Sequence, residues 1–201
     1  TDAVCGWLRM HDQTANPQTN IWVRVESGAS LTCAGWGEDD TAGLNVGMSD
    51  EALLSLDGGD LYATNVVIGY EAAGSGIVSN NGGRMDVRWI HVGNSGMGRL
   101  DNNGTVKVSD SVVIGRKQAA TGVFTISGGK TTVGNYLLVG HAGNGELFAN
   151  AGFSTRYLVV GCSSNGVGVA TLAGSGATGS VSEACYVGGR HLSDEETGSG
   201  V

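Results

Sequence analysis

The chain has 201 residues, a net charge of −8, 36 glycines and one proline. Its 11 Lys and Arg residues are scattered, with Arg116 and Lys117 as the one adjacent pair, which excludes the basic patch of a nucleic-acid-binding protein. No apolar run reaches the roughly 18 residues of a membrane-spanning helix. The glycines have no period of three, so collagen is excluded, and the 40% of apolar residues fall in regular columns, which excludes a disordered chain.

The N-terminal residues 1–20 fit no regular pattern and contain the only proline, so we expect an arm or cap there. Because the sequence starts at Thr1 without a methionine, we expect a processed form. From Ile21 onward apolar residues alternate with polar ones, and Ser27-Gly28 predicts a turn before a second alternating run. Residues 21–201 are therefore expected to form one repeat domain.

An internal repeat of about 23 residues fills the rest of the chain. Each unit closes with Val-Gly or Ile-Gly. The closing glycines are Gly47, Gly69, Gly93, Gly115, Gly140, Gly161 and Gly188, with spacings of 22, 24, 22, 25, 21 and 27. The residues one and three places before each glycine are apolar in every unit, and this two-residue period predicts a strand and not a helix.

A second strand precedes each of these strands and starts at a small residue, usually glycine. Its alternate residues form inward columns, one of which contains Asn80 and Asn102. Buried amides need partners, so we expect these two to stack on one another. The step from a closing glycine to the next opening residue alternates between 5 and 7 residues, which predicts a larger corner on every second unit. Whether one unit or two units make a coil is left open.

A unit this short cannot bury its own apolar face, so neighbouring units must stack. Two short strands per unit predict an all-β chain folded as a single-chain parallel β-solenoid (β-helix). We expect about seven rungs of 21–27 residues, a rung being one complete coil. The crossover rule for parallel strands predicts a right-handed coil. Both ends of such a stack would expose unpaired strand edges.

The last residues of the sequence look like the start of a further unit, because 198–201 repeat an opening motif with no strand after it. We expect an incomplete last rung whose missing strand comes from another molecule, with the N-terminal arm as the candidate donor. The expected interface residues are Thr1, Val4, Cys5, Trp7, Val187, Gly200 and Val201. Subunits joined head to tail in this way would form a fibre or sheath.

The cysteines are four in number: Cys5, Cys33, Cys162 and Cys185. An even count in an acidic, glycine-rich chain indicates an oxidising compartment, so all four are disulfide candidates with their pairing left open. A buried free thiol is an equal alternative for Cys185. The spacing of the cysteines does not match a zinc site, and we expect neither a metal nor a cofactor.

Carboxylates are the first candidates for catalysis, because solenoid lyases and glycosidases use clustered acids. Asp57 and Asp60 flank one turn, but no two units place acids in the same column. Residues 38–40 and 194–196 are acidic loops without the repeated nonapeptide of calcium-binding solenoids. We therefore expect solvated acids and no enzyme, with a polysaccharide lyase as a minor alternative. His91 and His141 are expected at the surface.

An apolar stripe is predicted between the two inward columns of the closing strands, formed by Val67, Val113, Leu138, Val159 and Tyr186. Exposed stripes of this kind mark contact surfaces, but a loop or the N-terminal arm could equally cover it. A second set, of outer aromatics, would allow a surface adhesin to bind cell-surface glycans: Trp22, Trp36, Trp89 and Tyr186.

The repeat resembles the glycine-rich β-helix repeats of bacterial surface proteins, including autotransporter passenger regions and the repeat regions of PEP-CTERM-type exported proteins. The resemblance covers residues 21–188, and its closest pieces are NVVIG at 65–69 and TISGG at 125–129. It implies a β-helix in an extracellular or cell-surface location and no particular activity. We therefore expect an extracellular structural protein that binds itself, with no nucleic-acid partner and no membrane span.

Overall fold

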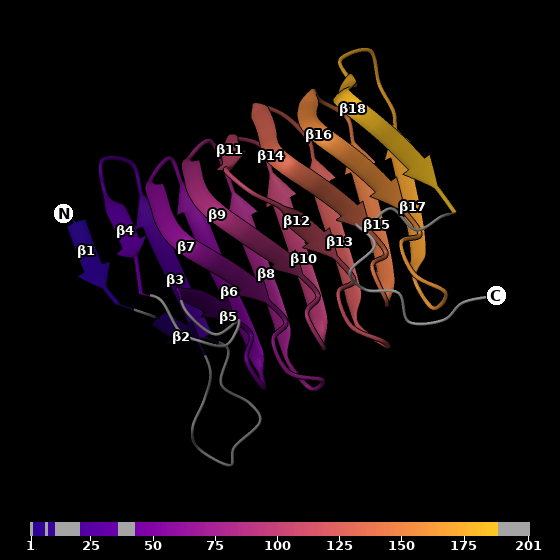
Figure 1. Ribbon diagram of the computed structural model, residues 1–201. Coiled ribbons are helices and arrows are strands. Elements are labelled where there is room, and N and C mark those ends of the chain that lie inside the picture. Colours follow the sequence, from indigo (N-terminus) through magenta and orange to yellow (C-terminus); the bar gives the residue numbers. More distant parts are fainter. Residues whose placement is uncertain (1, 7, 11–20, 36–42, 189–201) are drawn as a thin grey trace.

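The computed structural model describes residues 2–6, 8–10, 21–35 and 43–188. In these ranges every regular element is a strand, and the strands pair in parallel in two sheets. Figure 1 shows the strands stacked side by side along one axis, from β1 at one end to β18 at the other. The described chain is therefore a parallel β-solenoid of about seven rungs, as the repeat predicts.

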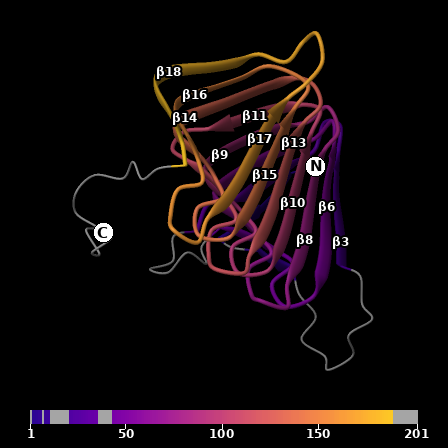
Figure 2. The same cartoon turned by 90° about the vertical axis from the view of Figure 1, so that its right-hand side faces the viewer.

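The larger sheet has 11 strands and the smaller sheet has 7. The larger sheet contains β1 (Asp2–Cys5), β2 (Leu8–Met10), β4 (Ser30–Cys33), β5 (Leu44–Val46), β7 (Asp60–Ile68), β9 (Arg84–Val92), β11 (Thr105–Val108), β12 (Val112–Ile114), β14 (Lys130–Val139), β16 (Phe153–Val160) and β18 (Gly179–Val187). The smaller sheet contains β3 (Ile21–Glu26), β6 (Glu51–Asp57), β8 (Ser75–Asn80), β10 (Met97–Asn102), β13 (Thr121–Ile126), β15 (Asn144–Ala149) and β17 (Val167–Leu172). Figure 2 shows the two sheets as separate walls of the coil.

Each repeat unit makes one rung. Leu54 of β6 pairs with Val78 of β8, one unit later, so the alternative of two units per coil is excluded. The corners alternate as predicted: those at 69–74, 115–120 and 161–166 each contain a hydrogen-bonded turn, such as Gly74 N donating to Glu71 O at 2.9 Å. The corners at 47–50, 93–96 and 140–143 are shorter bends.

The core lies between the sheets and runs along the whole stack. Its residues come from the predicted inward columns, for example Leu54, Val78, Leu100, Phe124 and Leu147, all fully buried. Because each column continues through successive rungs, the apolar side chains of one rung cover those of the next and remove them from water. This burial is the main stabilising contribution in such a fold.

The predicted amide stack is confirmed. Asn80 Nδ2 donates to Asn102 Oδ1 at 2.8 Å, and Asn102 Nδ2 donates to Thr131 Oγ1 at 3.0 Å. Asn102 Oδ1 also accepts from Gly104 N at 3.0 Å. Both asparagines are buried, and these contacts replace hydrogen bonds to water that the amides lose, except at Asn80 Oδ1, which has no partner.

The N-terminal residues that the structure describes belong to the solenoid. β1 pairs in parallel with β4, and β2 pairs in parallel with β5. Met10 is buried in the main core, and Cys5 and Leu8 pack against it. These two short strands thus form the larger sheet's first level, and the expected arm or cap can be placed only to this extent, since residues 11–20 lie outside the described ranges.

Candidate functional site

The two ends of the solenoid hold those expected interface residues that lie within the described ranges. Val4 of β1 is 78% exposed at one end, and Val187 of β18 is 77% exposed at the other. Figure 1 shows these two strands at opposite ends of the stack. Cys5 is half-buried beside Cys33. The remaining expected residues lie outside the described ranges: Thr1, Trp7, Gly200 and Val201.

The C-terminal end leaves core positions uncovered. Val187 pairs with Val160 of β16, and both belong to a column that starts at Met10. Val160 is 8% exposed, and the earlier members Val46 and Ile68 are fully buried. Val187 therefore lies against the core residue Val160 on one side and is exposed to water on the other. Cys185 and Leu172, which also end inward columns, are exposed as well.

The N-terminal end is closed at Met10 of β2, which is buried, and open at β1. β1 has β4 as its neighbour on one side, and within the described ranges no strand pairs with its other edge. The inward residue Ala3 is exposed there, whereas its register partner Leu31 is buried. Since the two sheets contain eight and seven levels along the stack, a strand of the larger sheet ends the solenoid on both sides.

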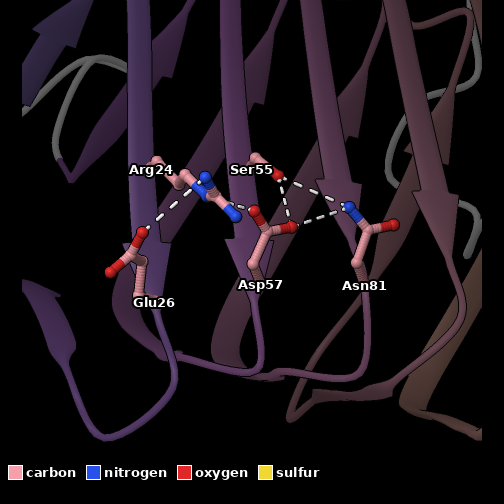
Figure 3. Close-up of polar contacts among 5 residues, drawn as sticks. All are labelled: Arg24, Glu26, Ser55, Asp57 and Asn81. Carbon is pink, nitrogen blue, oxygen red and sulfur yellow. Dashed lines mark hydrogen bonds and ion pairs between the residues drawn. The ribbon is translucent and has the colours of Figure 1, made fainter.

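A polar cluster on the outer side of the smaller sheet contains the first of the two acids considered for catalysis. Asp57 Oδ1 accepts from Ser55 Oγ at 2.9 Å and from Asn81 Nδ2 at 2.9 Å, while Asp57 Oδ2 accepts from Arg24. Arg24 also lies 3.7 Å from Glu26. Glu26 is the register partner of Asp57, so the expectation that no two units place acids in one column is wrong here. Figure 3 shows that these residues come from three successive rungs and converge on the Asp57 carboxylate.

This cluster holds Asp57 in its charged form. The hydrogen bond from Asn81, and then those from Ser55 and Arg24, lower the pKa of Asp57 below its usual range. A general acid needs the opposite shift, because it must hold a proton near neutral pH. The arrangement is suited to joining three rungs at the surface.

Asp60 has a different set of partners. It starts β7, and its carboxylate accepts from Tyr62 Oη at 3.1 Å, which raises the pKa of the Tyr62 hydroxyl. Two acids further along the stack lie close to arginines: Asp86 is 2.6 Å from Arg84, and Asp101 is 2.7 Å from Arg99. The acidic loops at 38–40 and 194–196 lie outside the described ranges.

The described ranges contain no group of three or more His, Cys, Asp or Glu side chains that could hold a metal ion. They also contain no helix long and apolar enough to cross a bilayer.

The predicted aromatic surface is divided between the sheets. Trp22 lies on β3 of the smaller sheet and is 61% exposed, while Trp89 lies on β9 of the larger sheet and donates its Nε1 to Asp110 at 2.9 Å. Tyr186 packs at the edge of a small apolar cluster. Trp36 lies outside the described ranges.

The predicted apolar stripe is covered. Val67, Val113, Leu138 and Val159 are all buried. The last three form a small cluster with Cys162, which directly follows the closing glycine of its unit. The alternative of a covering loop therefore holds, with Cys162 as one covering residue.

The prediction of a surface His91 is wrong. Its side chain is 3% exposed and packs edge to face on Trp89, with ring centroids 6.0 Å apart. His141 is half-buried, and its Nδ1 lies 3.0 Å from Arg116 O at a corner. A two-residue period places a side chain on the outer side of a strand, but it contains no information on the corner segments that fold over that side.

The cysteines occupy three places. Cys5 and Cys33 are register partners with their Sγ atoms 3.3 Å apart. Cys162 is buried in the small apolar cluster, and Cys185 is exposed on β18. The structure thus brings one of the possible pairs together.

Comparisons with known proteins leave the chain without an assigned relative: no family model, no curated protein and no solved structure matches it.

Proposed function

We propose that this protein is the subunit of an extracellular fibre or sheath, in which solenoids stack head to tail. The observation that supports this most strongly is the exposed end of the core at Val187, which occupies a column whose earlier members are buried. Leaving such a position in water costs about 1.5–3 kcal/mol for one side chain relative to burying it. A further rung on β18 would remove this cost.

A second copy of the same chain fits this edge. The columns of β18 are continuous with those of β1 and β2, since every step between them is a parallel pair in register. Extending that register by one step places Ala3 of the next copy on Gly179, and Leu8 on Cys185. Apolar or small side chains then meet at each of these inward positions.

The polarity of the strands favours a head-to-tail contact. All strand pairs in both sheets are parallel, so only unlike ends can continue the same pattern of hydrogen bonds. A contact between unlike surfaces does not close on itself, and it produces open filaments. The smaller sheet has one level fewer, so the contact assigned here is between β18 and the first level of the larger sheet, β1 and β2.

The test compares wild type with Val187→Lys and Ile77→Lys by sedimentation velocity over a range of concentrations, with negative-stain microscopy of the same samples. Ile77 is exposed on the side of the stack, in β8, and serves as the matched control. Wild type and Ile77→Lys should form filaments, and Val187→Lys should stay monomeric, because a charge at this position would be buried in the contact. A monomeric wild type, or filaments of Val187→Lys, would contradict the proposal.

A carbohydrate-binding adhesin is a second candidate, supported by Trp22. Its exposed ring borders a shallow hollow of about 340 Å³ that is also lined by Ile21, Leu53 and Ile77. An apolar surface with an indole at its rim can stack on a sugar ring while the indole N–H stays exposed to water. Binding to a glycan array that is lost in Trp22→Ala, with filaments unaffected, would favour this function over the first.

A further inference from the structure

We propose that Cys5 and Cys33 form an intramolecular disulfide that ties the first strand of the solenoid to the next level. The two residues face each other in the parallel pair of β1 and β4. Their Sγ atoms are 3.3 Å apart, and the residues are 28 apart in sequence. The bond would therefore link two neighbouring strands through residues that the repeat already places in register.

The backbone geometry meets the requirements of a disulfide. Paired strands lie about 4.8 Å apart, and disulfides join Cα atoms about 4.4–6.8 Å apart. Both side chains point inward in one column, which continues to Ala63 on β7. Bond formation requires the sulfur atoms to approach from 3.3 Å to the bonding distance of about 2.05 Å.

The other cysteines do not share this column. Cys185 pairs with Leu158, in the column that leads back to Leu8. Cys162 packs outside the main core, with Val113, Leu138 and Val159. Within the described ranges, only Cys5 and Cys33 stand side by side on neighbouring strands.

The reaction is thiol–disulfide exchange with a small-molecule disulfide such as oxidised glutathione. Cys5 is half-buried, whereas burial and the neighbouring Cys5 raise the pKa of Cys33 to about 12. The attacking species is a thiolate, so the reaction starts at Cys5, which forms a mixed disulfide and releases one glutathione thiol. Cys33 then loses its proton to solvent and attacks Cys5 Sγ, and the second glutathione leaves as a thiol. Two protein thiols are oxidised and one glutathione disulfide is reduced.

The bond would act on a weakly supported strand at the end of the described chain. β1 has four residues, three of them exposed, and a single neighbouring strand, β4, so it is expected to fray. A covalent link restricts the unfolded chain and holds β1 in place. This inference does not depend on the proposed assembly.

The experiment oxidises the reduced 201-residue chain with oxidised glutathione, in the Val187→Lys background so that assembly does not interfere. Free thiols are counted after denaturation, and tryptic peptides are identified by mass spectrometry. We expect two of the four thiols to disappear, and the peptide that ends at Arg9 to be linked to the peptide of residues 25–84. The melting temperature of the oxidised form should exceed that of the reduced form by on the order of 10 °C.

Two further variants serve as controls for the assignment. Cys33→Ala introduces alanine, the residue that the next level of the same column has at Ala63, so the variant should fold. It should show no difference in melting temperature between oxidised and reduced samples. Cys185→Ala should behave like its parent. The proposal is overturned if Cys5 and Cys33 both remain alkylatable after oxidation, or if Cys5 is found linked to Cys162 or Cys185.

Discussion

At the scale of single residues, the polar side chains inside and outside the solenoid hold successive rungs together. Asn80 and Asn102 interrupt an otherwise apolar column, with Leu56 before them and Ile126 after them. Asn80 Nδ2 and both ends of the Asn102 amide are hydrogen-bonded, whereas Asn80 Oδ1 is buried without a hydrogen-bond partner. Removing Asn102 would leave further groups of this network without hydrogen bonds in a dry interior.

Replacing only one of the two asparagines should therefore lower the free energy of unfolding by more than half of what the pair contributes. Asn102→Leu keeps the size of the side chain but removes the acceptor of Asn80 Nδ2 and of Gly104 N. We expect the free energy of unfolding, from urea denaturation, to fall by about 1–3 kcal/mol. The double variant Asn80→Leu/Asn102→Leu should lose less than the sum of the two single losses, since the mutual contact is then replaced by an apolar one. Strictly additive losses would show that the two amides act independently.

The Asp57 cluster predicts a dependence of stability on pH. Its folded pKa is lowered from the unfolded value of 3.8, so its contribution is present above that value and is lost as the pH falls through the folded pKa. Between pH 7 and pH 2 wild type should lose more stability than Asp57→Asn, and the two should converge in acid. Asn81→Ala removes the largest cause of the shift and should reduce the pH dependence. Parallel pH profiles of wild type and Asp57→Asn would contradict this account.

The inward columns, and with them the amide pair, were predictable from single residues, because a side chain's column follows from its place in a two-residue period. His91 was not. Its column is on the outer side of the strand, and the sequence contains no simple signal for the corner segments that cover that side. The strand register that places Cys5 opposite Cys33 was also not predictable, since residues 1–20 lack the glycine that closes the other units.

At the scale of elements, the closing glycine ends each long strand and starts the corner. All seven predicted closing glycines have positive φ, for example +73° at Gly93. A Cβ at Gly93 would also lie 2.2 Å from Thr121 O at the start of β13, so the position excludes a side chain for two separate reasons. The positive φ is common to all seven closing glycines, and the backbone clash is added at every one except Gly161 and Gly188.

A matched pair of variants separates the two reasons. Gly82 has φ +81° but open space around it, so Gly82→Ala has only the cost of the left-handed backbone, about 1–2 kcal/mol. Gly93→Ala has a similar cost and a backbone clash in addition. Thermal or urea unfolding should therefore show a clearly larger loss for Gly93→Ala. Equal losses would mean that the strands move apart freely at the corner.

The first strands show where a repeat-based prediction stops. β1 and β2 have four and three residues, and no closing glycine follows Met10. The sequence therefore predicts a solenoid from Ile21, whereas the structure extends the larger sheet to Asp2. The two apolar residues Leu8 and Met10, two apart like every other closing pair, were the available signal.

At the scale of the whole molecule, head-to-tail assembly requires that the two unlike ends of the solenoid fit each other. One end presents β18 with Val187 exposed, and the other presents β1 with Ala3 exposed. At the same two ends β2, β3 and β17 are also paired on one edge only, whereas every other described strand is paired on both edges. Exposed edges of this kind are the usual route by which sheets add strands from another molecule.

Mixing two end-blocked variants tests the head-to-tail contact most directly. Val187→Lys blocks the C-terminal end and Ala3→Lys blocks the N-terminal end, so each should be monomeric alone. In a mixture, the intact C-terminal end of Ala3→Lys should bind the intact N-terminal end of Val187→Lys. Sedimentation velocity should then show a heterodimer and nothing larger. A mixture that stays monomeric, or either variant forming dimers by itself, would contradict the account.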